Sequence, residues 1–271
     1  MAKPIKDFQS LTLADDFMFG EIMRQVRFCK PFLEALWDIK IADIHVVDKQ
    51  KDLTDEYNYH GIRLDVYIED DNGTKYDIEM QTTTQKELPK RIRYYQSGID
   101  RRMLKRSNDY DKLHESYVIF ICLSDYFARG LAKYERVSCI KDAPDIIYDD
   151  GTHAIILNAD FSIGNAAPDI LEFLAYIKAR YAKMPFDIQH SMYLTAVEDA
   201  IREIKQDEGK EKKYMTMAMK LRDTYNEGIE QGITSVVANM LSLNESPTNI
   251  SKMTGQPLAV VEKIIAKLNN K

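Results

Sequence analysis

Three side chains with oxygen donors lie close together in one short stretch of the sequence. In LDVYIEDDNGTKYDIEMQ, residues 64–81, Asp65 precedes a turn, whereas Glu79 and Gln81 follow it and are separated by one residue. Carboxylate and amide oxygens that converge on one point are ligands for a hard cation such as Mg²⁺ or Mn²⁺. Whether these oxygens converge depends on how the two flanks of the turn pair.

Both flanks alternate strictly between apolar and polar residues, which predicts strands over residues 62–69 and 75–81. Asn72-Gly73 is a strong signal for a two-residue hairpin turn. That turn, however, would align the apolar positions of one strand with the polar positions of the other. A three-residue loop with Gly73 in the left-handed conformation shifts the register by one residue and restores the match.

In the shifted register Val66 pairs with Ile78, and Asp65 lies directly opposite Glu79. Opposed residues of an antiparallel pair have Cβ atoms about 4.5–5.5 Å apart, and like charges there repel. A shared cation would remove that repulsion. Because Gln81 lies two residues beyond Glu79, it points to the same face of the hairpin. The spacing therefore predicts a metal-binding group of Asp65, Glu79 and Gln81.

A second interpretation is that these acids are ordinary solvated residues, because carboxylates are mostly exposed in proteins. The other acids of the stretch are expected to have no role at the centre. Asp70 and Asp71 would shape the turn, while Glu69 and Asp77 would lie on the polar face away from it. Periodicity alone leaves both interpretations open.

Other segments have the patterns needed to cover this hairpin. Residues 88–106 have an apolar helical stripe, and residues 116–123 form a nearly continuous apolar run, which is typical of a central strand covered on both faces. A Thr-x-x-Asp sequence that resembles a capping box opens the first helix. Further helices are expected over residues 12–26, 31–39, 187–204 and 212–243, and further strands over 44–49, 134–140 and 154–158.

The composition is that of a globular protein, with 271 residues of which 45% are hydrophobic and 30% are charged. The net charge of −6 argues against general coating by nucleic acid, but the charge is uneven. Residues 86–112 hold nine Lys or Arg against four Asp or Glu, whereas residues 142–160 hold five Asp and neither Lys nor Arg. A local basic groove is therefore compatible with the acidic total.

The three cysteines and five histidines show no metal-ligand spacing in the sequence. Cys122 and Cys139 lie in apolar surroundings and are expected to be buried thiols, which fits a reducing cytoplasm. The N-terminal stretch lacks the apolar region of a signal peptide, and no apolar run approaches the roughly 18 residues of a membrane span. The sequence thus predicts a cytoplasmic protein without a membrane partner.

Several blocks of the sequence resemble one known family. GIRLDVYIEDDNGTKYDIEMQT, LPKRIRYYQSGID and SYVIFICLSD are similar, in this order, to the PD-(D/E)XK nuclease family transposases, also called recombination-promoting nucleases. LTLADDFMFGEIM before them and GTHAIILNA after them also look like that family, so the resemblance covers residues 11–181. It implies an α/β fold with a restriction-endonuclease-like core, in which a mixed central β-sheet is flanked by helices, followed by an α-helical C-terminal region.

The resemblance also implies roles for the hairpin residues. Asp65 and Glu79 match the two motif acids and would bind Mg²⁺, or Mn²⁺ as a substitute, with the backbone carbonyl of Met80 as a third protein ligand. The implied activity is metal-dependent hydrolysis of phosphodiester bonds in DNA, by a metal-activated water. Gln81 stands at the position of the motif lysine, where it can take part in catalysis by hydrogen bonding but carries no charge.

A cation could come instead from the helix that follows. Arg91 is the candidate for a phosphate contact, and Lys90 and Tyr94 lie opposite the apolar stripe beside it. The alternative is that this is a solvated helix face. An additional acid could come from the first helix, where Asp16 is preferred over Asp15, since Asp15 could cap that helix.

The patterns change from mixed α/β to helical near residue 184. We therefore expect a nuclease-like domain over residues 1–184 and a helical region over residues 185–271. Residues 248–268 could form a helix-turn-helix with Gly255 at the turn. At the start of its second helix only Gln256 suits the reading of bases, so packing or oligomerisation is the favoured role.

Three functional hypotheses remain open. The first is a Mg²⁺-dependent deoxyribonuclease that cuts DNA in transposition or recombination. The second is a catalytically weakened nuclease fold that binds DNA or protein without cleavage, for which Gln81 and the acidic net charge are the indications. The third is a homo-oligomer that is assembled by the long C-terminal helices.

Overall fold

The structure is a computed structural model that describes residues 5–46, 64–83, 86–104 and 109–269. The chain divides into two compact units, one of residues 9–206 and a helical one of residues 1–8 with 207–271. The sequence pattern changes near residue 184, but α5 (Met192–Gln206) belongs to the first unit, where Tyr193 O–H donates to the carbonyl oxygen of Phe28 over 3.0 Å. None of the helices in the described ranges combines the length and apolar character that crossing a bilayer requires.

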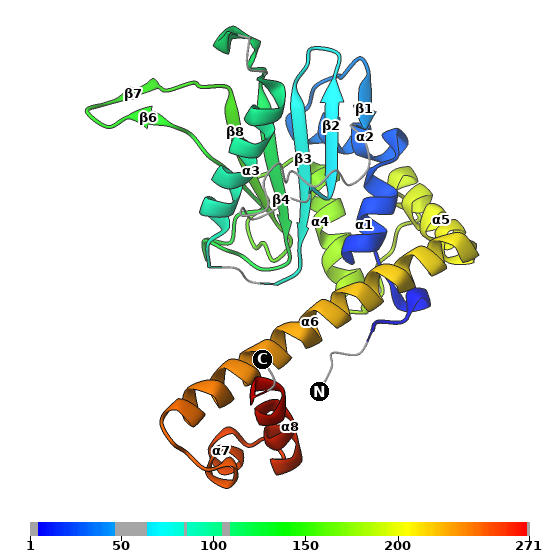
Figure 1. Ribbon diagram of the computed structural model, residues 1–271. Coiled ribbons are helices and arrows are strands. Elements are labelled where there is room, and N and C mark those ends of the chain that lie inside the picture. Colours follow the sequence, from blue (N-terminus) through cyan, green and yellow to red (C-terminus); the bar gives the residue numbers. More distant parts are fainter. Residues whose placement is uncertain (1–4, 47–63, 84–85, 105–108, 270–271) are drawn as a thin grey trace. The chain divides into compact units, whose positions relative to one another are not determined.

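A six-stranded mixed sheet forms the centre of the unit of residues 9–206 (Figure 1). The strand order is β1-β2-β3-β4-β8-β5, in which β3, β4 and β8 are parallel and the other neighbours are antiparallel. The bounds are Ile44–Val46 (β1), Val66–Asp70 (β2), Lys75–Gln81 (β3), Ser116–Cys122 (β4), Lys133–Glu135 (β5) and Thr152–Asn158 (β8). The predicted α/β fold with a mixed central sheet is thus confirmed.

The β2–β3 hairpin has the register that the hydrophobic pattern predicts. Val66 pairs with Ile78, so the apolar residues of both strands share one face. At the turn, Asp70 N–H donates to Thr74 O over 3.1 Å, and Gly73 has a φ of 82°. The three-residue loop with a left-handed glycine is therefore confirmed. The Asp70 carboxylate closes this turn by accepting hydrogen bonds from Asn72 N–H, Thr74 N–H and Tyr76 O–H.

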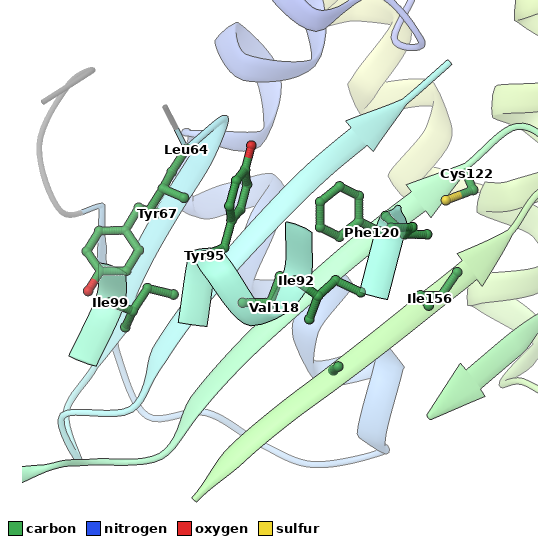
Figure 2. Packing of buried hydrophobic residues seen from close by; sticks show 11 residues of the cluster. Leu64, Tyr67, Ile92, Tyr95, Ile99, Val118, Phe120, Cys122 and Ile156 are labelled. Atoms are coloured by element: carbon green, nitrogen blue, oxygen red, sulfur yellow. The ribbon is translucent and has the colours of Figure 1, made fainter. Parts of the chain in front are cut away.

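Helix α3 (Leu88–Met103) covers one face of the sheet (Figure 1). Figure 2 shows side chains of α3 facing those of the strands beneath it. The buried cluster includes Leu88, Ile92, Tyr95 and Ile99 of α3 with Val118, Phe120 and Ile156 of the sheet. Each such side chain contributes about 1.5–3 kcal/mol when it leaves water, which fixes α3 over the hairpin. The predicted amphipathic helix and central strand are confirmed, although residues 105 and 106 lie outside the described residues.

Aromatic contacts join helix α2 (Val26–Trp37) to the opposite face of the sheet. The Trp37 ring centroid lies 6.0 Å from that of Tyr76 and 4.8 Å from that of Tyr117. Helix α4 (Pro168–Tyr181) packs on α2, where the Phe32 and Phe173 rings are 5.1 Å apart. The sheet is therefore covered by helices on both faces, which explains why β4 is apolar along its whole length.

Several local predictions differ from the structure. The helix expected over residues 31–39 begins earlier, at Val26, and contains Pro31 in its interior. The expected single helix over residues 12–26 is shorter, because α1 (Asp16–Met23) ends before Gln25, whose extended backbone starts α2. The expected strand over residues 134–140 is divided, and β6 (Cys139–Ile140) forms a separate two-stranded sheet with β7 (Ala143–Ile147). Cys139 is exposed there, so the prediction of a buried thiol is wrong for Cys139 and correct for Cys122.

Some predicted segments extend beyond what the structure describes. Residues 47–49 of the first strand and 62–63 of the second lie outside the described residues. The parts that are described, β1 and β2, agree with the predicted strands.

The helical unit consists of the long α6 (Glu208–Ser242) followed by α7 (Pro247–Thr254) and α8 (Leu258–Asn269). Gly255 ends α7 with a φ of 69°, which is the left-handed conformation expected at the turn. The small core of this unit contains Val237, Ile250, Val261 and Ile264. The predicted pair of short helices around Gly255 is confirmed, and a role in reading DNA stays a prediction.

We expect Gly73→Ala to lower the free energy of unfolding by about 1–2 kcal/mol, because the left-handed conformation disfavours a Cβ. The added Cβ would also lie 2.9 Å from the His114 ring. Gly73→Asn is the matched control, since asparagine tolerates this conformation better and should cost less. Urea denaturation measures both variants, and equal stability of Gly73→Ala and wild type would contradict the role of this turn.

Candidate active site

At the open end of the hairpin, the backbone N–H groups of the two strands donate to the carboxylates of two acids instead of to backbone carbonyls. Asp65 immediately precedes β2, and its N–H donates to Glu79 Oε1 over 2.8 Å. In return, Met80 N–H donates to Asp65 Oδ2 over 3.2 Å. Each carboxylate is thus held by the backbone of the opposite strand, and the two acids of the predicted group lie side by side.

Arg91 reaches this pair from α3. Its Nη2 donates to Glu79 Oε2 over 2.8 Å, its Nη1 to Gln81 Oε1 over 2.6 Å, and its Nε to the Tyr95 hydroxyl over 2.9 Å. The guanidinium carbon also lies 5.0 Å from the ring centroid of Tyr95 and 4.9 Å from that of Phe120. A guanidinium has the fixed, planar set of donors that such acceptors require. Arg91 is therefore held in one place by side chains of β3 and α3.

Gln81 orients its amide between two partners. Its Nε2 donates to the carbonyl oxygen of Thr83 over 2.6 Å and to the Thr83 hydroxyl over 3.0 Å, which leaves Oε1 for Arg91. The side chain is buried. The neutral Gln81 side chain thus contacts a positive charge that comes from the neighbouring helix.

Asp77 corrects one prediction, because it is fully buried and not on a solvated face away from the centre. Alternation places it on the same face as Glu79, and α3 covers that face at this point. Neither Asp77 oxygen accepts a hydrogen bond from the described residues. The nearby Arg91 and Glu79 side chains nevertheless act to lower the pKa of Asp77. Burying a carboxyl group without hydrogen-bond donors costs folding free energy, and Asp77 has this cost within the candidate site.

Burial and repulsion by neighbouring acids raise the pKa of Asp65, Asp77 and Glu79. The pKa of Glu79 is well above its ordinary value because of burial, then because of Asp77 and Asp65. Burial and then the charge of Asp65 likewise raise the pKa of Asp77. For Asp65, burial and then the charge of Asp16 raise the pKa to about 6, while Arg24 and Arg91 oppose the rise. Without a bound cation, this site therefore holds protons at pH values where exposed carboxyl groups have lost them.

Residues at both ends of α1 act on Asp65. The effect of Asp16 on the Asp65 pKa agrees with the preference for Asp16 as the additional acid, whose role stays a prediction. Asp15 accepts hydrogen bonds from the N–H and hydroxyl of Thr12 over 2.7 and 3.1 Å, so it holds the turn before α1. Arg24 Nη2 donates to the backbone oxygen of Asp65, a contact that sequence analysis missed because the two residues are 41 positions apart.

Lys90 and Tyr94 lie on the outer side of α3, away from the buried stripe. Lys90 is exposed and Tyr94 is 40% exposed, so both can be reached by a large molecule. Of the three predicted phosphate contacts, Arg91 has a described hydrogen bond to an acid of the site, Glu79. Contact of Lys90 and Tyr94 with DNA stays a prediction.

Two exposed groups elsewhere in this unit bring metal-ligand atoms within 4.8 Å of one another. One consists of Asp43, His45 and Asp71, and the other of Glu115, Asp149 and His153. In each group one member is distant in the sequence from the other two, so spacing alone could not reveal the complete set. Exposed acidic groups of this kind are common without an ion.

The donor set of the hairpin fits a hard divalent cation. The Asp65 and Glu79 carboxylates are oxygen ligands of the type that Mg²⁺ and Mn²⁺ prefer, as is a backbone carbonyl such as that of Met80, whose N–H donates to Asp65. The buried Asp77 side chain adds a third acid, whose oxygens accept no hydrogen bond from the described residues. A divalent cation would favour the charged forms of these acids.

A mixed sheet flanked by helices, with paired acids where the hairpin ladder ends, is the arrangement expected of a PD-(D/E)XK nuclease fold. The chain belongs to the PD-(D/E)XK nuclease family transposases, whose family model matches residues 18–231 of it. Searches of curated proteins and of solved structures found no match. The match extends the resemblance beyond residue 181 and includes the hairpin, α3 and most of α6. A nuclease or transposition role follows from membership of this family.

The raised pKa of Asp65 predicts a pH dependence of stability in EDTA. An acid whose pKa is about 6 when folded and 3.8 when unfolded favours folding at low pH, and this contribution is lost as the pH rises through 6. Asp65→Asn does not titrate, so its stability relative to wild type should rise between about pH 4 and 7, by up to about 3 kcal/mol. Chemical denaturation across this range measures the difference, and a difference independent of pH would contradict the shifted pKa.

Proposed function

We propose that this chain is a divalent-metal-dependent DNA endonuclease that acts in transposition or recombination. The observation that carries the proposal is the pair Asp65 and Glu79, held side by side by reciprocal bonds to the opposite strand. Membership of a nuclease family supports the same chemistry. DNA in the cytoplasm is the proposed substrate.

In this proposal, Asp65, Glu79 and the carbonyl of Met80 hold Mg²⁺, with Mn²⁺ as a substitute. When bound there, such a metal would lower the pKa of a water molecule and neutralise charge on the phosphate. The chain fixes the two carboxylates through Asp65 N–H and Met80 N–H, so they need no rearrangement of the backbone to act together. Asp16 is the proposed additional acid, because its charge reaches Asp65.

Arg91 is proposed to take the place of the motif lysine. Its guanidinium is bonded to Gln81, the residue at the lysine position, and to Glu79. Such a group can stabilise the negative charge of the phosphate in the transition state by two parallel hydrogen bonds. Gln81 would then act in catalysis by orienting Arg91. The positive charge that a lysine would supply at position 81 would come from Arg91 instead.

Lys90 and Tyr94 are proposed to extend this contact along the DNA backbone from the exposed side of α3. Contacts between lysine and phosphate release counterions, so the affinity for DNA should fall steeply with salt. The uneven charge of the chain agrees with this, since residues 86–112 hold nine Lys or Arg against four Asp or Glu.

Plasmid nicking tests the proposal directly. We expect cleavage by wild type with Mg²⁺ or Mn²⁺, none in EDTA, and at least about a hundredfold loss in Asp65→Ala and Glu79→Ala. Asp71→Ala is the matched control, because this exposed acid belongs to the turn of the same hairpin. Circular dichroism checks that each variant folds. If wild type cuts no substrate while both alanine variants bind DNA as well as it does, the chain is a binding module.

A charge exchange tests the role of Arg91. Gln81→Lys would place an ammonium where the Arg91 guanidinium is now 2.6 Å from the amide oxygen, so this variant should cut more slowly. Arg91→Gln should also cut more slowly because the cation is lost. The double variant Gln81→Lys/Arg91→Gln returns one cation to the strand, so it should exceed both single variants, with a coupling of about 1–3 kcal/mol.

Single-turnover nicking at saturating DNA separates this effect from binding. Lys90→Gln removes a neighbouring charge on the exposed face and should weaken DNA binding at low salt, with little change in the saturated rate. A Gln81→Lys variant that is faster than wild type would show that Arg91 does not replace the lysine.

A further inference from the structure

Arg24 connects the end of α1 to the backbone of Asp65. Its Nη2 donates to the Asp65 carbonyl oxygen, while Asp65 N–H donates to Glu79 Oε1. Asp65 lies at the point where the β2–β3 ladder ends, so its two backbone polar groups are satisfied by side chains from α1 and β3. Since buried backbone groups must find partners, these two bonds fix how the backbone of Asp65 is turned.

Gly20 gives the Arg24 side chain the space for this contact. Residues four apart in a helix lie on one face, and side chains lean toward the N-terminus, so Arg24 extends over position 20. A Cβ at Gly20 would lie 2.8 Å from Nη1 and 3.2 Å from Cζ of Arg24. Any other residue at this position would displace the guanidinium. Because glycine is a poor residue for a helix interior, helix formation alone does not explain Gly20.

The charge of Arg24 also acts on Asp65, the residue whose backbone oxygen accepts its hydrogen bond. Arg24 and Arg91 are the two cations that favour the charged form of Asp65 against burial and the charge of Asp16. Arg91 makes its hydrogen bonds to Glu79 and Gln81. Arg91 thus acts on both acids of the pair, whereas the described hydrogen bond of Arg24 is to Asp65.

We propose that Arg24 is a positioning residue, which fixes the backbone of Asp65 so that its carboxylate faces Glu79, and that Gly20 provides the space for it. This inference rests on the proposed function, because it treats Asp65 as a cation ligand. Arg24 acts through Asp65 and does not itself touch the cation. Groups that orient a ligand in this way typically change metal affinity by 10-fold to 100-fold when they are removed.

Mn²⁺ affinity of the full chain, measured by electron paramagnetic resonance of the free ion, tests the inference. We expect Gly20→Ala and Arg24→Gln each to weaken Mn²⁺ binding about tenfold or more. The double variant should be no weaker than Arg24→Gln, because Gly20 acts only through Arg24. Arg24→Lys keeps a charged donor and should recover part of the affinity. Gly228→Ala is the matched control, since it adds a Cβ to a helical glycine with nothing within 4 Å.

Hydrogen exchange in EDTA gives a readout that needs neither metal nor activity. The Asp65 amide should exchange faster in Gly20→Ala and Arg24→Gln, while the helical circular dichroism of Gly20→Ala stays unchanged. Faster exchange in a protein that binds no Mn²⁺ would support the positioning role and overturn the proposed metal site. Unchanged exchange and Mn²⁺ affinity would overturn the inference. So would weaker DNA binding with unchanged Mn²⁺ affinity, which would make Arg24 a phosphate contact.

Discussion

The site depends on keeping two carboxylates side by side although their charges repel. Asp65 and Glu79 are neighbours because the hairpin has one register, and a slip of one residue would turn one of them to the other face. Gly73 supports that register by adopting a conformation that closes the three-residue loop. Where the ladder ends, each carboxylate accepts a backbone N–H of the opposite strand, so the repelling groups are bonded in place.

Burial makes this arrangement costly, and the neighbouring elements offset the cost in different ways. Removing one partner of a buried ion pair typically costs about 3–5 kcal/mol, which indicates how much Glu79 depends on Arg91. Asp77 has no such partner among the described residues, and its raised pKa shows that it holds a proton more readily than an exposed acid. The face covered by α3 thus holds more acidic groups than it has described cations to pair with them. Departures from the usual rules of burial are expected where a protein binds a ligand.

Local alternation was sufficient to predict the two strands of the hairpin, their register and the stripe of α3, because each depends on residues near one another in the sequence. It also placed Asp77 and Glu79 on one face. It could not show that α3 closes this face over Asp77, since the position of a helix is a property of the whole packed unit. The contact between Arg24 and Asp65 was missed for the same reason, and Cys139 was misplaced because its apolar neighbours belong to a hairpin that leaves the main sheet.

Gln81 takes on a different meaning once its contacts are considered. A lysine at this position would place its ammonium against the guanidinium of Arg91, and two cations in a half-buried site repel, so the strand and the helix cannot both supply the charge without cost. A neutral amide avoids that conflict, because its oxygen accepts from Arg91 while its nitrogen is held by Thr83. With arginine on α3 in place of lysine on β3, the position of the proposed catalytic cation depends on the packing of α3, since Arg91 lies against Tyr95 and Phe120. Movement of α3 would therefore move the cation relative to Glu79, whereas a lysine on β3 would stay with the sheet.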